Sequence, residues 1–174
     1  MPAQPVVVVL HDGDLPPELA LAPVAERAEL RLTEADGLAE ALRGADVLFA
    51  YDFLSTAVPD AWGAADSLRW LHVAAAGVDS VLAGPVRDSD AVVTNSRGVF
   101  EQTIAEYVLA QVLSFAKDLP GSLRRQQQHR WEHRESQRVA GTRAVVVGTG
   151  PIGRAIARLL RGVGVEVHGS GRRA

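Results

Sequence analysis

The sequence predicts an α/β protein in which a first domain built on a parallel sheet is followed by the start of a second. Short β-branched runs alternate with helical segments over the first half of the chain, and such alternation implies right-handed crossovers between parallel strands. The same pattern begins again after a long apolar helix and a polar stretch. We therefore expect one domain at residues 1–99, a hinge helix and arm at residues 100–140, and the incomplete start of a second domain at residues 141–174.

Composition and charge narrow the class of protein. A hydrophobic share of 47% and a charged share of 22% in 174 residues predict a buried core. A net charge of −3 gives no general attraction to nucleic acid or anionic lipid, and the absence of cysteine excludes disulfides and thiolate metal sites. No signal peptide is evident, and no apolar stretch approaches the roughly 18 residues that a membrane helix needs. We expect a soluble cytoplasmic protein without a membrane or nucleic-acid partner.

The first domain begins with Val6–Leu10, a β-branched run that predicts a strand buried on both faces. A turn at residues 11–14 follows this strand. Gly44 provides a C-terminal stop for a short helix. The remaining predicted elements are a helix at residues 22–28, a helix through Leu38, Ala41 and Leu42, and strands at residues 29–32, 46–50, 68–73 and 91–94.

Residues 103–119 form a helix that is apolar over most of its circumference, so neighbours must bury it on several sides. Pro120 and Gly121 are expected to end this helix. Residues 122–138 are polar, with five arginines and two histidines. A strand at residues 144–147, a helix at residues 154–161 and a strand at residues 165–168 then begin the second domain.

The strongest chemical signal is a G-x-G-x-x-G motif between a strand and a helix, the context of a Rossmann dinucleotide-binding turn. Gly148 permits the tight turn, Gly150 lets a diphosphate approach the backbone, and Gly153 lets helix and strand pack closely. Pro151 suits the first helical turn, while free N–H groups there, including that of Ile152, face the anion. A glycine-rich turn arising by chance is the alternative.

The end of the following strand indicates which dinucleotide is bound. A carboxylate there accepts from the ribose 2′-hydroxyl of NAD, whereas arginine suits the 2′-phosphate of NADP. The sequence has no carboxylate at this point and carries Ser170, Arg172 and Arg173 instead. These side chains favour NADP over NAD. Two solvated arginines at a frayed terminus remain the alternative.

Several segments together resemble the D-isomer-specific 2-hydroxyacid dehydrogenases, more narrowly the glyoxylate and hydroxypyruvate reductase-like members. The order of Gly-x-Asp after a strand, hinge, long helix, tryptophan-bearing arm and glycine turn matches the family's N-terminal portion. The resemblance implies a flavodoxin-like substrate domain followed by the start of a Rossmann domain. The matching segments are residues 70–79, 93–99 and 103–106, Trp131, Gly141 and the glycine turn.

The resemblance also implies substrate-binding residues. The backbone amides of Ala76 and Gly77, with Ala75 alongside, would hold the carboxylate of a small 2-oxo or 2-hydroxy acid, and small side chains after a central strand leave such amides open. A tight turn packed by small residues is the alternative. Tyr51 and Phe53 could wall the substrate, or could be exposed loop aromatics.

Other polar residues have less specific interpretations. Thr103 would contact the cofactor by resemblance, and a helix-starting hydroxyl is equally consistent with its spacing. Glu106 is expected to be a structural partner. His129 and His133 lie among arginines that repel a cation, so we expect no metal site. His72 is expected to be a lone histidine without chemistry.

The family's reaction transfers hydride between a nicotinamide and C2 of the acid, using an arginine, a histidine and an acidic partner of that histidine. None of the three maps onto this sequence, so we expect no catalytic residue within the chain and no activity from the chain alone. Two strands and one helix also fall short of an independent core, which predicts a disordered, aggregated or partner-rescued second domain. A homodimer through the helix and arm is expected, and a non-catalytic dimerising or binding protein is the alternative.

Overall fold

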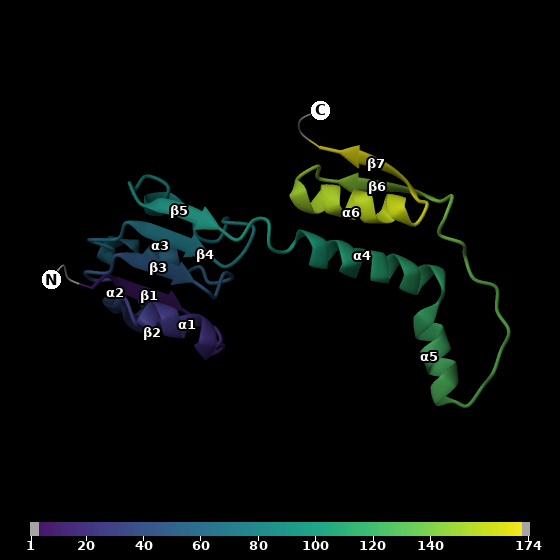
Figure 1. Cartoon of the computed structure of the whole chain (residues 1–174), viewed down its shortest axis with the longest axis horizontal. Coiled ribbons are helices and arrows are strands. Elements are labelled where there is room, and N and C mark those ends of the chain that lie inside the picture. The colour runs from purple at the N-terminus through teal and green to yellow at the C-terminus, as the bar shows by residue number, and fades with distance from the viewer. Residues whose placement is uncertain (1–3, 172–174) are drawn as a thin grey trace. The chain divides into compact units, whose positions relative to one another are not determined.

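The computed structural model describes residues 4–171, and the chain divides into two compact units. Unit 1 comprises Met1–Arg97 and unit 2 comprises Gly98–Ala174. Both units consist of parallel strands with helices packed on them, as the sequence predicts (Figure 1). No helix in the described part of the chain is long and apolar enough to cross a bilayer.

Unit 1 is built on a five-stranded parallel sheet of order β2-β1-β3-β4-β5. Ala50 lies opposite Val73 and Val73 lies opposite Asn95, so the last three strands of this order end level with one another. The connecting loops that follow these strands therefore meet at one edge of the sheet. The strands are β1 Val6–Leu10, β2 Glu29–Thr33, β3 Val47–Ala50, β4 Trp70–Val73 and β5 Val92–Asn95.

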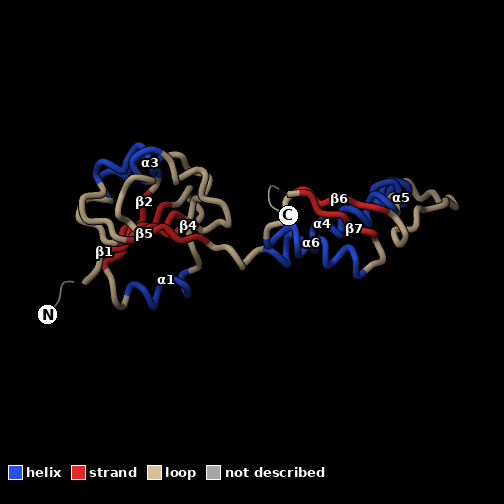
Figure 2. The backbone as a smooth tube through the Cα atoms, turned by 90° about the horizontal axis from the view of Figure 1, so that it is seen from above, coloured by secondary structure: helices blue, strands red, loops and turns tan. Residues whose placement is uncertain are grey.

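Helices cover both faces of this sheet, with α1 (Glu18–Ala25) on one face and α3 (Ala57–Ala61) on the other (Figure 2). The second face also carries α2 (Leu38–Ala41), and the main core lies there. Three short 3-10 helices, Ala35–Gly37, Trp62–Ala64 and Gly84–Val86, complete the unit. The largest fully buried side chains are Leu10, Leu38, Leu42, Leu48, Leu71, Val8, Val9, Val58, Val73, Val81 and Val86.

The helix expected at residues 22–28 is displaced toward the N-terminus. It begins at Glu18 and ends at Ala25, with Pro23 inside it. A helix that began at residue 22 would have Pro23 in its first turn, where proline is commonest. In the structure the chain is already helical before the proline, so that prediction was wrong in its boundaries.

Unit 2 contains α4 (Glu101–Ala116), α5 (Leu119–Gln127), α6 (Pro151–Gly162) and the parallel pair β6 (Arg143–Val147) and β7 (Glu166–Ser170). Helix α6 packs on the two strands, and α4 packs on α6. Their shared apolar cluster includes Val139, Leu160, Val165 and Val167. Leu109, Val112, Leu113 and Ala116 of α4 pack against this cluster. Helix α4 therefore supplies apolar surface that was not counted with the second domain, so the core of unit 2 is larger than two strands and one helix alone would give.

The prediction that Pro120 and Gly121 end the long helix was wrong. Both residues lie in the first turn of α5. Helix α4 ends at Ala116, and Asp118 adopts a left-handed conformation with φ 47°. The Asp118 carboxylate then accepts a hydrogen bond from the Gly121 N–H at 3.1 Å and caps α5. Proline fits a first turn because its missing N–H has no helical partner there. The arm is consequently helical to Gln127, turns at residues 128–129 and has no regular secondary structure over residues 130–139.

Candidate functional site

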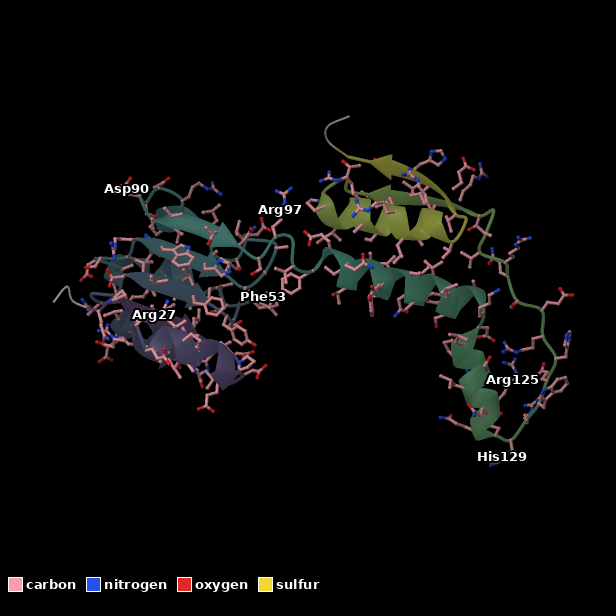
Figure 3. All side chains as sticks on the ribbon, viewed as in Figure 1. Arg27, Phe53, Asp90, Arg97, Arg125 and His129 are labelled. Atoms are coloured by element: carbon pink, nitrogen blue, oxygen red, sulfur yellow. The ribbon has the colours of Figure 1, made fainter. Side chains whose placement is uncertain are left out.

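The substrate-site residues predicted from the sequence gather at the carboxyl edge of the unit 1 sheet. Tyr51 follows β3, residues 74–77 follow β4, and Ser96 follows β5. Figure 3 labels Phe53 and Arg97 at this edge, whereas Arg27 and Asp90 lie at the opposite edge. In parallel α/β sheets, ligands bind at the carboxyl ends of the strands.

The loop at residues 74–77 presents its amides away from β5. The Ala75 carbonyl accepts from the Ser96 N–H at 2.9 Å, and the Ala76 carbonyl accepts from Asn95 Nδ2 at 2.7 Å. Because C=O and N–H point in opposite directions across a trans peptide, the N–H groups of Ala76 and Gly77 point to the other side. Within residues 4–171 no protein group accepts a hydrogen bond from Ala75, Ala76 or Gly77 N–H. Adjacent unpaired amides on one side are a backbone arrangement suited to an anion.

A carboxylate lies beside these amides. A Cβ built on Gly77 would lie 3.5 Å from Asp79 Oδ2. This negative charge opposes the binding of an anion at the amides.

Tyr51 lies at the same edge and is held by its backbone. Its N–H donates to the Leu10 carbonyl at 3.0 Å, and its half-buried ring stands 5.8 Å from that of Phe49. Phe53 is 43% exposed. Tyr51 is thus the better supported of the two as an ordered wall beside the loop.

His72 is a residue that the sequence reasoning missed. Its Nδ1 lies 2.8 Å from Thr94 Oγ1, and its Nε2 lies 3.2 Å from Ser96 Oγ. Thr94 Oγ1 also accepts from Trp70 Nε1 at 2.8 Å. The signal in the sequence was the pair of hydroxyl residues Thr94 and Ser96, spaced by two at the end of β5, which matches the spacing of Trp70 and His72 on the strand beside it.

The glycine turn of unit 2 lies at the junction of β6 and α6, as predicted. Gly148 has φ +101°, a conformation that favours glycine. A Cβ on Gly153 would meet the Gly148 carbonyl oxygen at 1.8 Å, so only glycine permits this approach of helix and strand. A Cβ on Gly150 would meet nothing within 4 Å, which leaves space for a ligand against the backbone. The three glycines therefore have the backbone geometry that the motif requires.

Some backbone N–H groups of this turn donate hydrogen bonds within the protein, and others do not. The Gly148 N–H donates to the Ser170 carbonyl at 2.7 Å and is unavailable to a ligand. In the described chain, no protein acceptor pairs with the N–H groups of Gly150, Ile152 or Gly153. Pro151 contributes no donor, while the Arg154 guanidinium reaches back to the Thr149 carbonyl at 2.5 Å. Arg154 thus adds positive charge beside the turn, a contribution that the sequence reasoning did not include.

The remaining predicted cofactor contacts have less structural support. Ser170 ends β7, whereas Arg172 and Arg173 lie outside the described residues. Thr103 is exposed in the first turn of α4 and does not cap the helix, which begins two residues earlier. Glu106 accepts from Gln102 Nε2 at 2.7 Å, in keeping with a structural role. Between residues 4 and 171, no group of three or more His, Cys, Asp or Glu side chains could hold a metal ion.

The arm of unit 2 is fastened to its own helices by ion pairs. The Arg134 guanidinium pairs with Asp118, and Arg125 donates to Glu132 at 2.9 Å. Desolvation opposes ionisation of Asp118, but the Gly121 N–H and the two guanidiniums outweigh it and lower the pKa of this carboxyl. The hydrogen bond from Arg125 lowers the pKa of Glu132.

Further along, the Gln137 N–H donates to the Ala116 carbonyl at 2.9 Å, and Lys117 Nζ donates to the Gln137 carbonyl at 2.8 Å. The fastened arm leaves apolar side chains outside. Phe115 is 83% exposed and Trp131 is 88% exposed. Tyr107, Leu119 and Leu123 are exposed as well.

Comparison with known proteins identifies relatives of both units. The family described as D-isomer specific 2-hydroxyacid dehydrogenase, NAD binding domain, matches residues 109–174. A curated relative, an uncharacterized protein in the mprR 3′ region of Streptomyces coelicolor, is 34% identical over 105 residues, which are 60% of this chain and 37% of the relative.

Two solved structures extend the match to nearly the whole chain. A D-isomer specific 2-hydroxyacid dehydrogenase family protein from Aeromonas salmonicida subsp. salmonicida A449 has 29% identity and a TM-score of 0.76, over 96% of this chain and 53% of that one. The D-isomer specific 2-hydroxyacid dehydrogenase from Xanthobacter autotrophicus Py2, in complex with NADPH and MES, has 24% identity and a TM-score of 0.71, over 96% of this chain and 53% of that one. The chain thus spans about half the length of these solved relatives. In its sequence over residues 109–174 and in its fold, the chain is similar to the D-isomer specific 2-hydroxyacid dehydrogenases.

Proposed function

We propose that this chain forms part of an oxidoreductase that transfers hydride between NAD(P)H and a small 2-oxo or 2-hydroxy acid resembling glyoxylate or hydroxypyruvate. The observation that carries the proposal is the turn after β6, where the N–H groups of Gly150, Ile152 and Gly153 are free at the start of a helix. Such a helix start attracts a diphosphate through its N–H groups and its dipole. The family match to a dinucleotide-binding domain supports the same assignment.

The residues of the turn fit a dinucleotide diphosphate. The space beside Gly150 is open, so a phosphate can reach the backbone there, and Pro151 costs only a single donor. Arg154 would add a charge-assisted contact. When bound, the nicotinamide would supply or accept the hydride.

In unit 1 the Ala76 and Gly77 amides, with Ala75 alongside, would bind the substrate carboxylate, and Tyr51 would shield one side of it from water. The arginine, histidine and acidic residue that the family resemblance implies for catalysis have no counterpart in these 174 residues. We therefore expect the chain by itself to bind both ligands without turnover.

Titration of the ¹⁵N-labelled chain with NADPH tests the dinucleotide site. We expect shifts at Gly150, Ile152 and Gly153, and we expect Gly150→Ala to abolish them because its methyl group would fill the open space. Gly162→Ala is the matched control, since it also adds a methyl group with no neighbour within 4 Å on the same helix. Equal binding by Gly150→Ala and the unaltered chain would exclude this site.

The preference for NADP rests on Ser170, Arg172 and Arg173, and a solved relative from Xanthobacter autotrophicus is described in complex with NADPH. Guanidinium groups there would pair with the 2′-phosphate. Replacing both arginines by alanine should weaken NADPH binding and leave NADH binding unchanged. A clear preference of the unaltered chain for NADH would refute this part of the proposal.

A second candidate function is that of a non-catalytic dimerising or binding protein, with α4, α5 and the arm as its interface. The exposure of Phe115 and Trp131 beside a fastened arm favours this surface as the homodimer contact in either case. Sedimentation equilibrium should detect a dimer that Phe115→Asp disrupts, whereas Leu54→Asp, at an exposed site in unit 1, should not. A well-behaved monomer would remove both the dimer and this second candidate.

A further inference from the structure

We infer that His72 is a positioning residue for the substrate loop, acting as a neutral imidazole that carries its proton on Nε2. The inference rests on the proposed function only in taking residues 74–77 as the carboxylate site. It begins from a continuous set of hydrogen bonds across β4 and β5, from Trp70 to Ser96 and the loop carbonyls.

The direction of the hydrogen bonds follows from the one group that can only donate. An indole N–H has no acceptor function, so Trp70 Nε1 donates to Thr94 Oγ1 at 2.8 Å. The Thr94 hydroxyl hydrogen is then free to point at His72 Nδ1, 2.8 Å away. Nδ1 accepts this hydrogen bond only if it carries no proton.

The hydrogen bond at Nε2, on the other side of the ring, has a direction that agrees with this assignment. His72 Nε2 lies 3.2 Å from Ser96 Oγ, whose own hydroxyl donates to the Val73 carbonyl at 3.3 Å. Ser96 Oγ must therefore accept from His72, which places the imidazole proton on Nε2. In the opposite tautomer the Thr94 hydroxyl hydrogen would have no acceptor among the described residues, and the single Ser96 hydroxyl hydrogen would face two acceptors, His72 Nε2 and the Val73 carbonyl.

Neighbouring aromatic rings limit the motion of this imidazole. The ring of Phe49 lies 5.7 Å from that of His72, and the Trp70 ring lies 6.2 Å away in an edge-on arrangement. A side chain held by two rings and two hydrogen bonds loses little further entropy when it fixes its neighbours. His72 is thus suited to hold Ser96 in one rotamer.

Ser96 transmits this order to the substrate loop. Its hydroxyl is bound to the carbonyl of Val73, the residue before the loop, and its N–H is bound to the Ala75 carbonyl at 2.9 Å. Fixing the Ala75 carbonyl fixes the direction of the Ala76 N–H in the same peptide. His72 therefore acts on the proposed carboxylate site through Ser96 without touching a ligand.

Long-range ¹H–¹⁵N correlation spectra of the unliganded chain test the assigned tautomer. We expect Nδ1 to show the shift of an unprotonated nitrogen and Nε2 that of a protonated one at neutral pH. Trp70→Phe removes the indole donor, so Thr94 can accept from Nδ1 and the tautomer population should move toward Nδ1–H. A predominant Nδ1–H form in the unaltered chain would overturn the inference.

Two substitutions test the positioning role. His72→Gln retains a hydrogen-bond donor that reaches Ser96. His72→Phe retains the size of the side chain but has no hydrogen-bonding group. Loss of one neutral hydrogen bond predicts about three- to tenfold weaker oxalate binding in His72→Phe, with affinity within about twofold of the unaltered chain in His72→Gln. The shifts of the Ala76 and Gly77 amides measure this binding.

Hydrogen exchange of the Ser96 amide gives a readout that needs no ligand, and it should quicken in His72→Phe but not in His72→Gln. Trp70→Phe, at a side chain that is 45% exposed, provides the tautomer readout if His72→Phe does not fold. Failure of the unaltered chain to bind oxalate would count against the proposed function, while the Ser96 exchange would still test His72. Equal exchange in both His72 variants would overturn the positioning role.

Discussion

Leu10, Leu48 and Leu71 of unit 1 have no exposed surface, whereas the buried side chains of the unit 2 cluster keep between 4% and 8% of theirs. The two units also differ on the sheet face opposite the main apolar cluster. In unit 1, Trp70 and His72 are joined to Thr94 by hydrogen bonds. In unit 2, Val145 and Val147 are 67% and 85% exposed.

This difference shows that the backbone geometry of a candidate ligand site does not depend on how completely the core beneath it is buried. Unit 2 has the less completely buried core, yet the backbone of its glycine turn is held by specific contacts. The turn depends on close backbone contacts between Gly148 and Gly153, and on the bond from Gly148 to Ser170. Such local contacts need only one strand, one helix and one neighbouring strand.

The largest expected effect concerns the cores. Leu48→Ala should lower the free energy of unfolding of unit 1 by about 2–5 kcal/mol, because it leaves a cavity among fully buried neighbours. Leu160→Ala should lower the free energy of unfolding of unit 2 by an amount at the lower end of that range, since its less tightly buried neighbours can move into the cavity. Urea unfolding followed by amide exchange in each unit measures both, and Leu54→Ala, at a 77% exposed site, is the control. Equal costs at the two leucines would contradict the comparison.

Gly153→Ala should destabilise unit 2 by about 1–3 kcal/mol, because the added methyl group collides with the Gly148 carbonyl and forces the helix away. Unit 1 should unfold as before. Urea unfolding measures this effect as well. Gly162→Ala is the control, since its added methyl group in α6 has no neighbour within 4 Å. Normal stability of Gly153→Ala would mean that the strand and helix are not held as closely as described.

Asp79→Asn should strengthen oxalate binding to unit 1 roughly fivefold, since a like charge about 4 Å away costs on the order of 1 kcal/mol in water. Isothermal titration at low salt gives the affinity. The gain should shrink as salt screens the charge. Asp90→Asn removes a charge at the opposite edge of the sheet and should change little (Figure 3); an equal gain there would indicate a general charge effect.

Acid should release the arm of unit 2 while its helices remain. The pKa values of Asp118 and Glu132 are lowered in the folded chain, so their ionised forms stabilise the arm at neutral pH. This stabilisation is present above the ordinary carboxyl pKa of about 4 and is lost as the pH falls through the lowered values. Exchange of the Gln137 amide should quicken in that range. Arg134→Gln should produce the same release at neutral pH, and unchanged protection in this variant would show that the ion pairs do not hold the arm.

Much of the candidate site was predictable because its signals are local. The glycine motif and the small residues after β4 each depend on a few neighbours in the chain, and both lie where they were expected. The role of His72 could not be predicted in the same way, since its partners Thr94 and Ser96 are more than 20 residues distant in sequence. Pro120 was predicted to end a helix. In the structure the left-handed residue Asp118 separates two helices, and Pro120 lies in the first turn of the second.

The sequence alone determined the α/β class, the strands and the glycine turn, since hydrophobic period and backbone stereochemistry act over short stretches of chain. Tertiary structure decided which amides stay free. The Gly148 N–H is used by Ser170, whereas those of Ala76 and Gly77 are left open because Asn95 and Ser96 bind the neighbouring carbonyls. Strand pairing sets these partners, and pairing is a property of the assembled sheet rather than of any one segment.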